Sequence, residues 1–236
     1  MRDEPLQPWL RETPQLDLSH PRLRITAQKL TQSLQTMPAR AAALQDFVRR
    51  LPFSAPGRAR TPRASRVLQQ GHGDSHAKAV LFTALCRAAG IPARVQFLRV
   101  RSQFLAGIVR DRPEAVVHAV AQVHVEGRWV STDGYVLDPV LFVRAKELLN
   151  GSDLDSGWGL VRDAASYWDG KSPCLHQFRW DDVLLGYGVF DDVQDFLGSG
   201  VRLEREWFGG LRQAMRSCLL NRRVARLRSS AAIPAR

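Results

Sequence analysis

The stretch GHGDSHAKAVLFTALCRAAGIPAR, Gly71 to Arg94, restricts the fold more than any other part of this sequence. Apolar residues recur at helical spacing along it, at positions 81, 82, 85, 88 and 89, which predicts a helix with one buried face. Gly90 ends this helix as a C-terminal cap, and Pro92 prevents its continuation. The polar, glycine-rich turn before it sets the helix N-terminus near Asp74 and Ser75.

The elements on either side of this helix predict the fold class. Helical periodicity runs over residues 23–34 and 39–51 before it, and over 138–149 after the strands. The segment 93–100 alternates apolar and polar residues, and the segment 116–136 reads as a β-hairpin. Helices therefore come before strands instead of alternating with them. This order predicts an α+β fold in which N-terminal helices and a central helix pack on an antiparallel sheet.

The turn of the predicted hairpin sets its register. Glu126-Gly127 forms a two-residue loop. Counting outward from this loop places Val120 opposite Asp133, and His118 lies two residues along on the same face as Val120. His118 and Asp133 thus become diagonal neighbours, roughly 7–8 Å apart at their α-carbons and within side-chain reach.

Length and composition are typical of one globular domain. The 236 residues are 44% hydrophobic and 24% charged, well away from the disordered class, and we expect a single domain over residues 1–210. No apolar run approaches the ~20 residues needed to cross a bilayer, and the N-terminus lacks the apolar core of a signal peptide. The three cysteines are an odd number without CxxC spacing. These features predict a soluble, cytoplasmic protein.

The net charge of +11 raises the question of nucleic-acid binding. Only four of the 34 basic residues are lysines, and the arginines are dispersed along the chain. The densest run, 212–228, has the pattern of a basic amphipathic helix within a C-terminal segment over 211–236. We expect this helix to have a solvated face and a frayed tail, and not to contact nucleic acid or a membrane. The sequence leaves the oligomeric state open.

Three side chains combine into a candidate catalytic group. Ser75 begins the central helix, where the partial positive charge of the helix N-terminus favours a developing anion. His118 can take the proton of a nucleophile, and Asp133 can hold the imidazole in the required tautomer. Spacing alone is a weak signal, because any chain of this length contains a serine, a histidine and an aspartate. Helix capping is the ordinary role of a serine at this position.

Two segments make the signal specific. GHGDSHAKAVLFTALCRAAGIPARVQF, followed by HAVAQVHVEGRWVSTDGYV, strongly resembles the core of the transglutaminase-like superfamily over about residues 65–138. The resemblance implies a papain-like α+β fold with a Cys-His-Asp triad that acts on amides through a thioester. It places His118 at the catalytic histidine and Asp133 at the orienting aspartate. Ser75 stands where the family has its nucleophilic cysteine.

The serine at position 75 departs from the family pattern. A thiol has a pKa near ~8.5, which a helix N-terminus or an imidazolium can lower until the thiolate is resident. A hydroxyl gains too little from the same surroundings, so its proton must be removed during the attack. Three alternatives follow. In the first, the chain is a Ser-His-Asp enzyme that acts on an amide or ester carbonyl by acyl transfer or hydrolysis. In the second, it is a catalytically inactive pseudoenzyme that binds a peptide or protein in the same cleft. In the third, it carries an engineered Cys-to-Ser change.

Other residues of the sequence help to decide between the enzyme and the pseudoenzyme. Keeping both His118 and Asp133 favours the enzyme, because a relic has no chemical need for the pair, whereas the missing thiol favours the pseudoenzyme. Cys86 is a poor substitute nucleophile, because it lies within the predicted helix, where burial is the ordinary expectation.

Polar residues near Ser75 are candidates for substrate binding. His72 and His76 lie four residues apart and flank the expected cleft, where either can hydrogen-bond a substrate. Gln69 or Gln70 is a candidate second oxyanion donor beside the backbone N–H of Ser75. The two histidines lack the cysteine or carboxylate cluster that would complete a metal-ligand set. We expect no metal and no cofactor, and a peptide, a protein or a small amide or ester as substrate.

Overall fold

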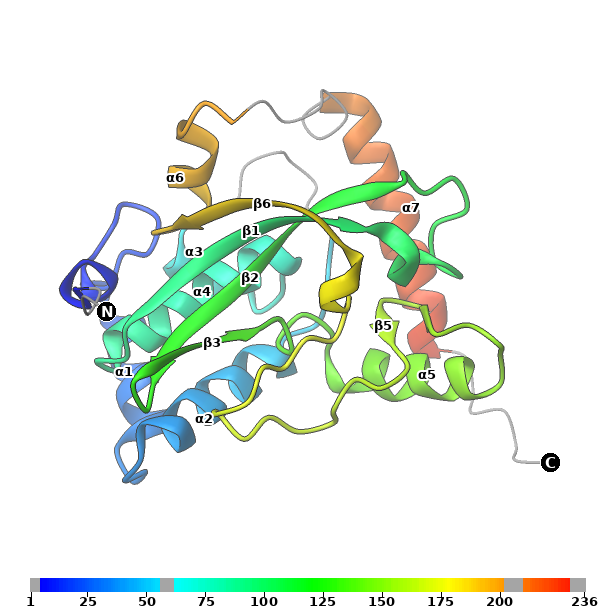
Figure 1. Ribbon diagram of the computed structural model, residues 1–236. Coiled ribbons are helices and arrows are strands. Elements are labelled where there is room, and N and C mark those ends of the chain that lie inside the picture. Colours follow the sequence, from blue (N-terminus) through cyan, green and yellow to red (C-terminus); the bar gives the residue numbers. More distant parts are fainter. Residues whose placement is uncertain (1–4, 56–61, 202–209, 230–236) are drawn as a thin grey trace.

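The computed structural model describes residues 5–55, 62–201 and 210–229, with side chains from residue 217 onward in the last range. Its centre is an antiparallel sheet of four strands in the order β3-β2-β1-β6. The strands are β1 (Ala93–Arg101), β2 (Ala115–Val125), β3 (Arg128–Thr132) and β6 (Val183–Phe190). Helices lie against one face of this sheet (Figure 1), so the predicted α+β fold is confirmed.

The helices that precede the sheet surround a central one. They are η1 (Gln7–Leu10), α1 (Pro21–Thr31), α2 (Met37–Arg50), α3 (Ala64–Gln70) and α4 (Ser75–Ala88). α4 packs on β1 and β2, and α1, α2 and α3 pack against its other side. Every residue from Ala79 to Cys86 is therefore fully buried. The prediction of a single buried face was too narrow, because neighbouring helices cover the side that faces away from the sheet.

Both ends of α4 lie where the sequence predicted them. Asp74 is the N-cap, and its carboxylate accepts a hydrogen bond from the backbone N–H of Ala77 at 2.9 Å. Ser75 is the first residue of the helix, and Ala88 is the last. Gly90 has a φ of +75°, the left-handed conformation that ends many helices.

The β2–β3 hairpin has the predicted register. Val125 pairs with Arg128 across the turn, and the ladder continues to the pair Ala121 and Thr132. Glu126 and Gly127 form the turn and have positive φ angles of 49° and 79°. Two positive φ angles are the requirement of the type I′ turn, whose twist matches that of the strands it joins.

The helix α3 (Ala64–Gln70) was not predicted. It buries only Ala64 and Val67, and seven residues are too few to show a helical period in the sequence. Gly71 follows it with a φ of +68° and turns the chain toward α4. The segment before α3 contributes to the same region, because Phe53 pairs with Gly73 in a short parallel bridge.

The short helix η2 (Ser102–Leu105) lies between β1 and β2, and the remaining elements follow the hairpin. They are α5 (Pro139–Asn150), β4 (Ser156–Gly157), β5 (Leu160–Val161), η3 (Trp180–Asp182), α6 (Val193–Gly198) and α7 (Gly210–Ser229). α5 confirms the helix predicted over 138–149, with Asp138 as its N-cap. α7 corresponds to the predicted basic helix and packs against α5 (Figure 1). Among the described residues, no helix combines the length and the apolar character needed to span a bilayer.

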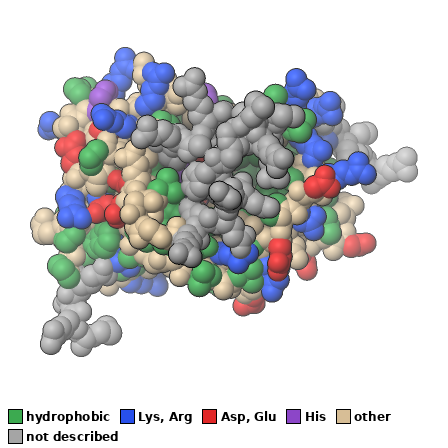
Figure 2. Space-filling model, turned by 90° about the horizontal axis from the view of Figure 1, so that it is seen from above, with side chains coloured by type: hydrophobic (Ala, Val, Ile, Leu, Met, Phe, Trp, Pro, Cys, Tyr) green, Lys and Arg blue, Asp and Glu red, His purple; other side chains and the backbone are tan. Residues whose placement is uncertain are grey.

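Among the described residues, the basic side chains do not gather at one place on the part of the face that Figure 2 leaves visible. Lysine and arginine side chains occur at both ends of this face, and aspartate and glutamate side chains lie among them. Nucleic-acid binding depends on a patch or stripe of positive charge that tracks the phosphate backbone. The view of this face gives no support to such a patch.

Gly170 is a position where we expect a large loss of stability on substitution. Its φ is +74°, and a Cβ added there would overlap the carbonyl group of Pro38 in α2. Gly90 is the matched control, because its φ is +75° but no atom lies within 4 Å of its added Cβ. Gly90→Ala should cost about 1–2 kcal/mol from the backbone conformation alone. Gly170→Ala should cost about 1–3 kcal/mol more. Equal urea midpoints for the two variants would contradict this.

Candidate active site

Ser75 is held at the N-terminus of α4 with its hydroxyl next to a histidine. The Oγ atom lies 3.5 Å from Nδ1 of His76, the next residue. The same Nδ1 is 3.8 Å from a carboxylate oxygen of Asp74. The ring of His76 is buried and stacks on Phe97 of β1, with 6.1 Å between the ring centroids. Ser75 is half-buried and stands at the positive end of the helix dipole.

His118 and Asp133 form a buried hydrogen-bonded pair. Nε2 of His118 lies 3.0 Å from Oδ2 of Asp133, and the side chains are 3% and 0% exposed. The predicted diagonal contact between these residues is therefore confirmed. An ionised carboxylate can only accept a hydrogen bond, so Nε2 carries the proton of the neutral ring. The lone pair is then on Nδ1, the atom that is able to take a proton.

A segment far along the chain holds Asp133 in place. The backbone N–H of His176 donates to Oδ1 at 2.5 Å, and the backbone N–H of Gln177 donates to Oδ2 at 3.4 Å. This segment follows Cys174, which pairs in parallel with Thr132 at the end of β3. The sequence pattern missed these contacts, because residues 150–200 carry no periodicity that would place them beside β3.

The two faces of β2 separate His118 from the core under α4. Ala119 and Ala121 belong to the hydrophobic core that contains α4. His118 points to the opposite face, as alternation along a strand requires. There its ring contacts those of Phe104 and Phe178, at centroid distances of 6.2 and 5.5 Å.

Ser75 is not hydrogen-bonded to the His118–Asp133 pair in this structure. Within the described ranges, the hydrogen-bond contact of the Ser75 side chain is with His76, and that of the His118 ring is with Asp133. The structure thus joins two of the three candidate catalytic side chains directly. The third stands at the predicted helix start beside a histidine that the sequence had placed among substrate-binding candidates.

The residues suggested for substrate binding lie in different surroundings. Gln70 and His72 are exposed, whereas His76 is buried. The side chain of Gln69 accepts a hydrogen bond from Arg66, within α3. Binding of substrate by Gln70, His72 or His76 stays a prediction.

Lys78 is a buried lysine one helical turn after Ser75. Its side chain is 0% exposed, and Nζ donates to the carbonyl oxygens of Tyr135 and Val136, at 3.0 and 2.9 Å. A longer contact of 3.5 Å reaches the carbonyl oxygen of Arg49 at the end of α2. Burial lowers the pKa of Lys78 from 10.5 to about 7. The sequence carried a signal for this residue, because Lys78 stands three and four positions before the apolar residues at 81 and 82.

The lowered pKa of Lys78 predicts a pH dependence of stability. Between about pH 7 and pH 10.5 the unfolded chain binds a proton at this lysine and the folded chain does not. The free energy of unfolding contributed by Lys78 therefore rises with pH across this window. Lys78→Met removes the titrating group. We expect the rise between pH 7 and 9.5, measured by urea denaturation, to be larger in the unmodified protein than in this variant, and identical slopes would contradict it.

The buried cysteines do not replace the missing nucleophile. Burial raises the pKa of Cys86 well above its ordinary value and that of Cys174 to about 12. Cys174 lies 3.4 Å from Nε2 of His176, whose pKa burial lowers to about 4. This pair is neutral near pH 7, and a thiol without thiolate character is a weak nucleophile.

A small apolar cavity of about 40 Å³ lies beside the candidate site. Its wall includes Phe53, which pairs with Gly73 just before Ser75, and Gln177, whose N–H binds Asp133. Apolar side chains of α7 complete the wall, namely Leu220, Val224 and Leu227. A substrate group that entered here would be apolar. The described residues include no group of three or more histidine, cysteine, aspartate or glutamate side chains placed to hold a metal ion.

The fold and the arrangement at the start of α4 are similar to the core of the transglutaminase-like superfamily. The helix α4 begins at Ser75 and packs on the sheet. His118 lies on strand β2 of this sheet, and Asp133 directly follows the neighbouring strand β3. Residues 24–134 match the family model of the transglutaminase-like superfamily. This range contains the first of the two segments that carry the resemblance, and all of the second except its last two residues, Tyr135 and Val136. The comparison with curated proteins gave no match.

One solved structure has a similar fold, and a second is similar over a smaller part of this chain. One is described as "a Putative Cysteine Protease from Cytophaga hutchinsonii"; it is 16% identical, with a TM-score of 0.52 over 80% of this chain and 48% of that chain. Another is described as "a Putative Protease from Parabacteroides distasonis", with 18% identity and a TM-score of 0.37, covering 53% of this chain and 24% of that one. This chain therefore spans less than half of either structure. At such identity the first likeness concerns the fold alone.

Proposed function

We propose that the protein is a transglutaminase-like enzyme that transfers or hydrolyses the acyl group of an amide or ester, with a peptide as the favoured substrate class. The observation that carries this proposal is the buried hydrogen bond between His118 and Asp133. The bond leaves the Nδ1 lone pair of a neutral imidazole as the base, and the carboxylate stabilises the imidazolium that forms after proton transfer.

The proposed reaction begins with attack by Oγ of Ser75 on the carbonyl carbon. Nδ1 of His118 removes the hydroxyl proton as the new C–O bond forms, and the developing oxyanion lies near the positive end of α4. The protonated ring then gives its proton to the leaving group as the bond to that group breaks. Water or an amine releases the acyl group from Ser75 in a second, analogous step. This attack requires Oγ of Ser75, which contacts His76 in this structure, to come within hydrogen-bond distance of Nδ1 of His118. Catalytic contacts often tighten only with bound substrate.

The second candidate function is binding without turnover. The observation that favours it is the position of the Ser75 hydroxyl, which contacts His76 and makes no hydrogen bond to His118 among the described residues. A serine oxygen sits closer to its backbone than a cysteine sulfur would. In this alternative a peptide or protein occupies the same cleft and is not cleaved.

A serine-directed fluorophosphonate probe separates the two functions. We expect covalent labelling of the unmodified protein, and its loss in both Ser75→Ala and His118→Ala, because the probe reacts only with an activated hydroxyl. His76→Ala is the matched control, and labelling should persist in it. If labelling is lost in His76→Ala but retained in His118→Ala, then His76 is the base and the role proposed for His118 is wrong. Absence of labelling in the unmodified protein, with thiol reactivity gained by Ser75→Cys, would leave only the binding function.

A further inference from the structure

We propose that Lys78 is a positioning residue that, together with Tyr135, sets the placement of Ser75 relative to His118 and Asp133. The inference rests on the proposed function, since it concerns the geometry of the same site. Lys78 touches none of the three side chains through a hydrogen bond. It acts through the backbone segments that carry them.

The first part of this connection joins α4 to the loop after β3. Lys78 and Ser75 are three residues apart on α4, so they belong to the same helical turn. The Nζ atom of Lys78 donates to the carbonyl oxygens of Tyr135 and Val136, which follow Asp133 by two and three residues. The loop is thereby held to the turn of α4 that carries the candidate nucleophile.

The second part joins the same loop to β2. The hydroxyl group of Tyr135 accepts a hydrogen bond from the backbone N–H of Ala121 at 3.1 Å and lies 3.5 Å from the carbonyl oxygen of Ala119. Ala119 is the neighbour of His118 on the strand. Tyr135 is fully buried, and its ring packs on Phe82 of α4, with 5.3 Å between the centroids. The three candidate residues are thus connected through one lysine and one tyrosine.

The bonding of Lys78 indicates a geometric role. Its ammonium group makes no ion pair in the described part of the chain, and its hydrogen bonds go to carbonyl oxygens. Asp74 and Asp138 attract its charge from a distance, and Arg49 and Arg228 oppose it. Burying a lysine without a carboxylate partner opposes folding, whereas the carbonyl acceptors of Tyr135 and Val136 specify where the loop and α4 meet. An apolar side chain would fill the space without specifying that meeting point.

The test uses Ser75→Cys as the background, because thiol reactivity reports the placement of this side chain without requiring turnover. Alkylation of residue 75 by iodoacetamide is measured from pH 5 to 10 by peptide mass spectrometry, so that the other cysteines do not interfere. Near an intact His118 the rate should rise well below pH ~8.5, the value for an ordinary thiol. Adding Lys78→Met should move the inflection toward ~8.5 and lower the rate at pH 6.5 by roughly tenfold. Lys29→Met, on the exposed side of α1, is the control and should leave the profile unchanged.

The outcomes separate the two levels of the proposal. In one outcome, the rate of alkylation inflects at low pH in a way that His118→Ala abolishes and Lys78→Met does not change. This result overturns the role of Lys78 and preserves the proposed site. An inflection near ~8.5 that is insensitive to His118→Ala overturns both. If Lys78→Met does not fold, Tyr135→Phe decides, because it removes only the hydroxyl that binds β2. We expect a smaller shift in the same direction from Tyr135→Phe, and an unchanged profile overturns the inference.

Discussion

Asp133→Asn is expected to reduce fluorophosphonate labelling of Ser75 by ~10,000-fold, the scale seen when an orienting aspartate is replaced in a Ser-His-Asp site. Asp133 accepts hydrogen bonds from His118 and from the backbone N–H groups of His176 and Gln177. An asparagine has one oxygen and one NH₂ group, so it cannot accept all three. The NH₂ group either faces a backbone donor or turns toward His118, where it favours the tautomer whose Nδ1 carries the proton.

The measurement is the second-order labelling rate at pH 7.5, combined with circular dichroism to show that the variant is folded. Asp163→Asn is the control, because Asp163 also accepts hydrogen bonds, but from the exposed side chain of Arg179. Its labelling rate should match that of the unmodified protein. A rate for Asp133→Asn within tenfold of the unmodified protein would show that this carboxylate does not orient a catalytic base.

Arg87→Met is expected to cause the largest loss of stability of any single substitution considered for this chain, about 3–5 kcal/mol. The guanidinium of Arg87 is 0% exposed and donates to a carboxylate oxygen of Asp191 at 2.9 Å. It also donates to the carbonyl oxygens of Arg11 and Ala93, each at 2.8 Å. Removing it leaves a buried carboxylate and two carbonyl groups without this partner. The free energy of unfolding from urea denaturation measures the effect.

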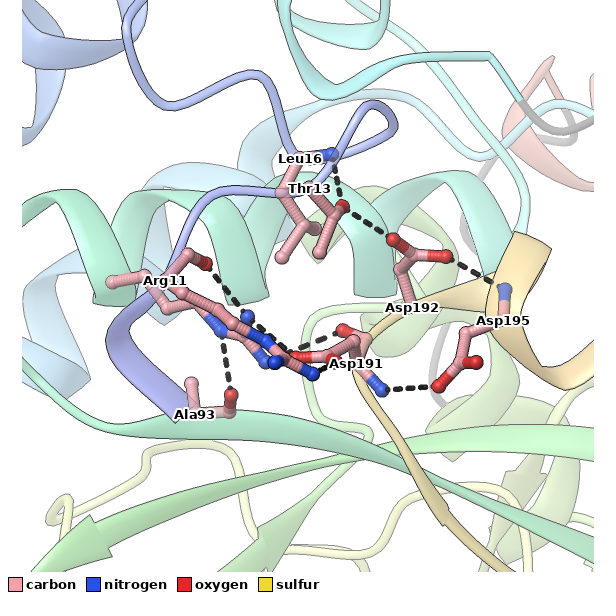
Figure 3. Close-up of polar contacts among 8 residues, drawn as sticks. Arg11, Thr13, Leu16, Ala93, Asp191, Asp192 and Asp195 are labelled. Atoms are coloured by element: carbon pink, nitrogen blue, oxygen red, sulfur yellow. Dashed lines mark hydrogen bonds and ion pairs between the residues drawn. The ribbon is translucent and has the colours of Figure 1, made fainter. Parts of the chain in front are cut away.

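Arg11→Met supplies the matched control at the same carboxylate. Arg11 pairs with the other oxygen of Asp191 at 2.5 Å, but its side chain is 63% exposed. Exposed ion pairs contribute little to stability, so this variant should lose much less than Arg87→Met. Figure 3 shows Arg11 and Asp191 in the cluster that joins the N-terminal segment to the turn before α6, together with Thr13, Asp192 and Asp195. Equal losses from the two arginine variants would contradict the assigned difference in burial.

The elements that the sequence predicted well are those specified by neighbouring residues. Asp74 and Gly90 mark the ends of α4, and the Glu126-Gly127 turn sets the register of the hairpin. These are signals of capping and turn chemistry, which act over a few residues. They were sufficient to bring His118 and Asp133 together, because only 15 residues separate that pair.

The elements that the sequence did not predict depend on contacts between distant segments. The N–H groups that hold Asp133 come from a segment 43 residues later, and the carbonyl groups that bind Lys78 lie 57 and 58 residues away. Burial of α4 on all sides likewise depends on α1, α2 and α3. A local pattern does not encode which of many possible partners a backbone N–H or a buried ammonium will have.

The sequence by itself determined the α+β class, the helix start at Ser75 and the His118–Asp133 pairing, because each follows from residues close together along the chain. Only the tertiary structure decided that the Ser75 hydroxyl lies beside His76, that His118 faces away from the core under α4, and that Lys78 and Tyr135 connect the segments around the site. These placements depend on how helices and strands pack in three dimensions. Packing is settled by the combined burial and hydrogen bonding of the whole domain.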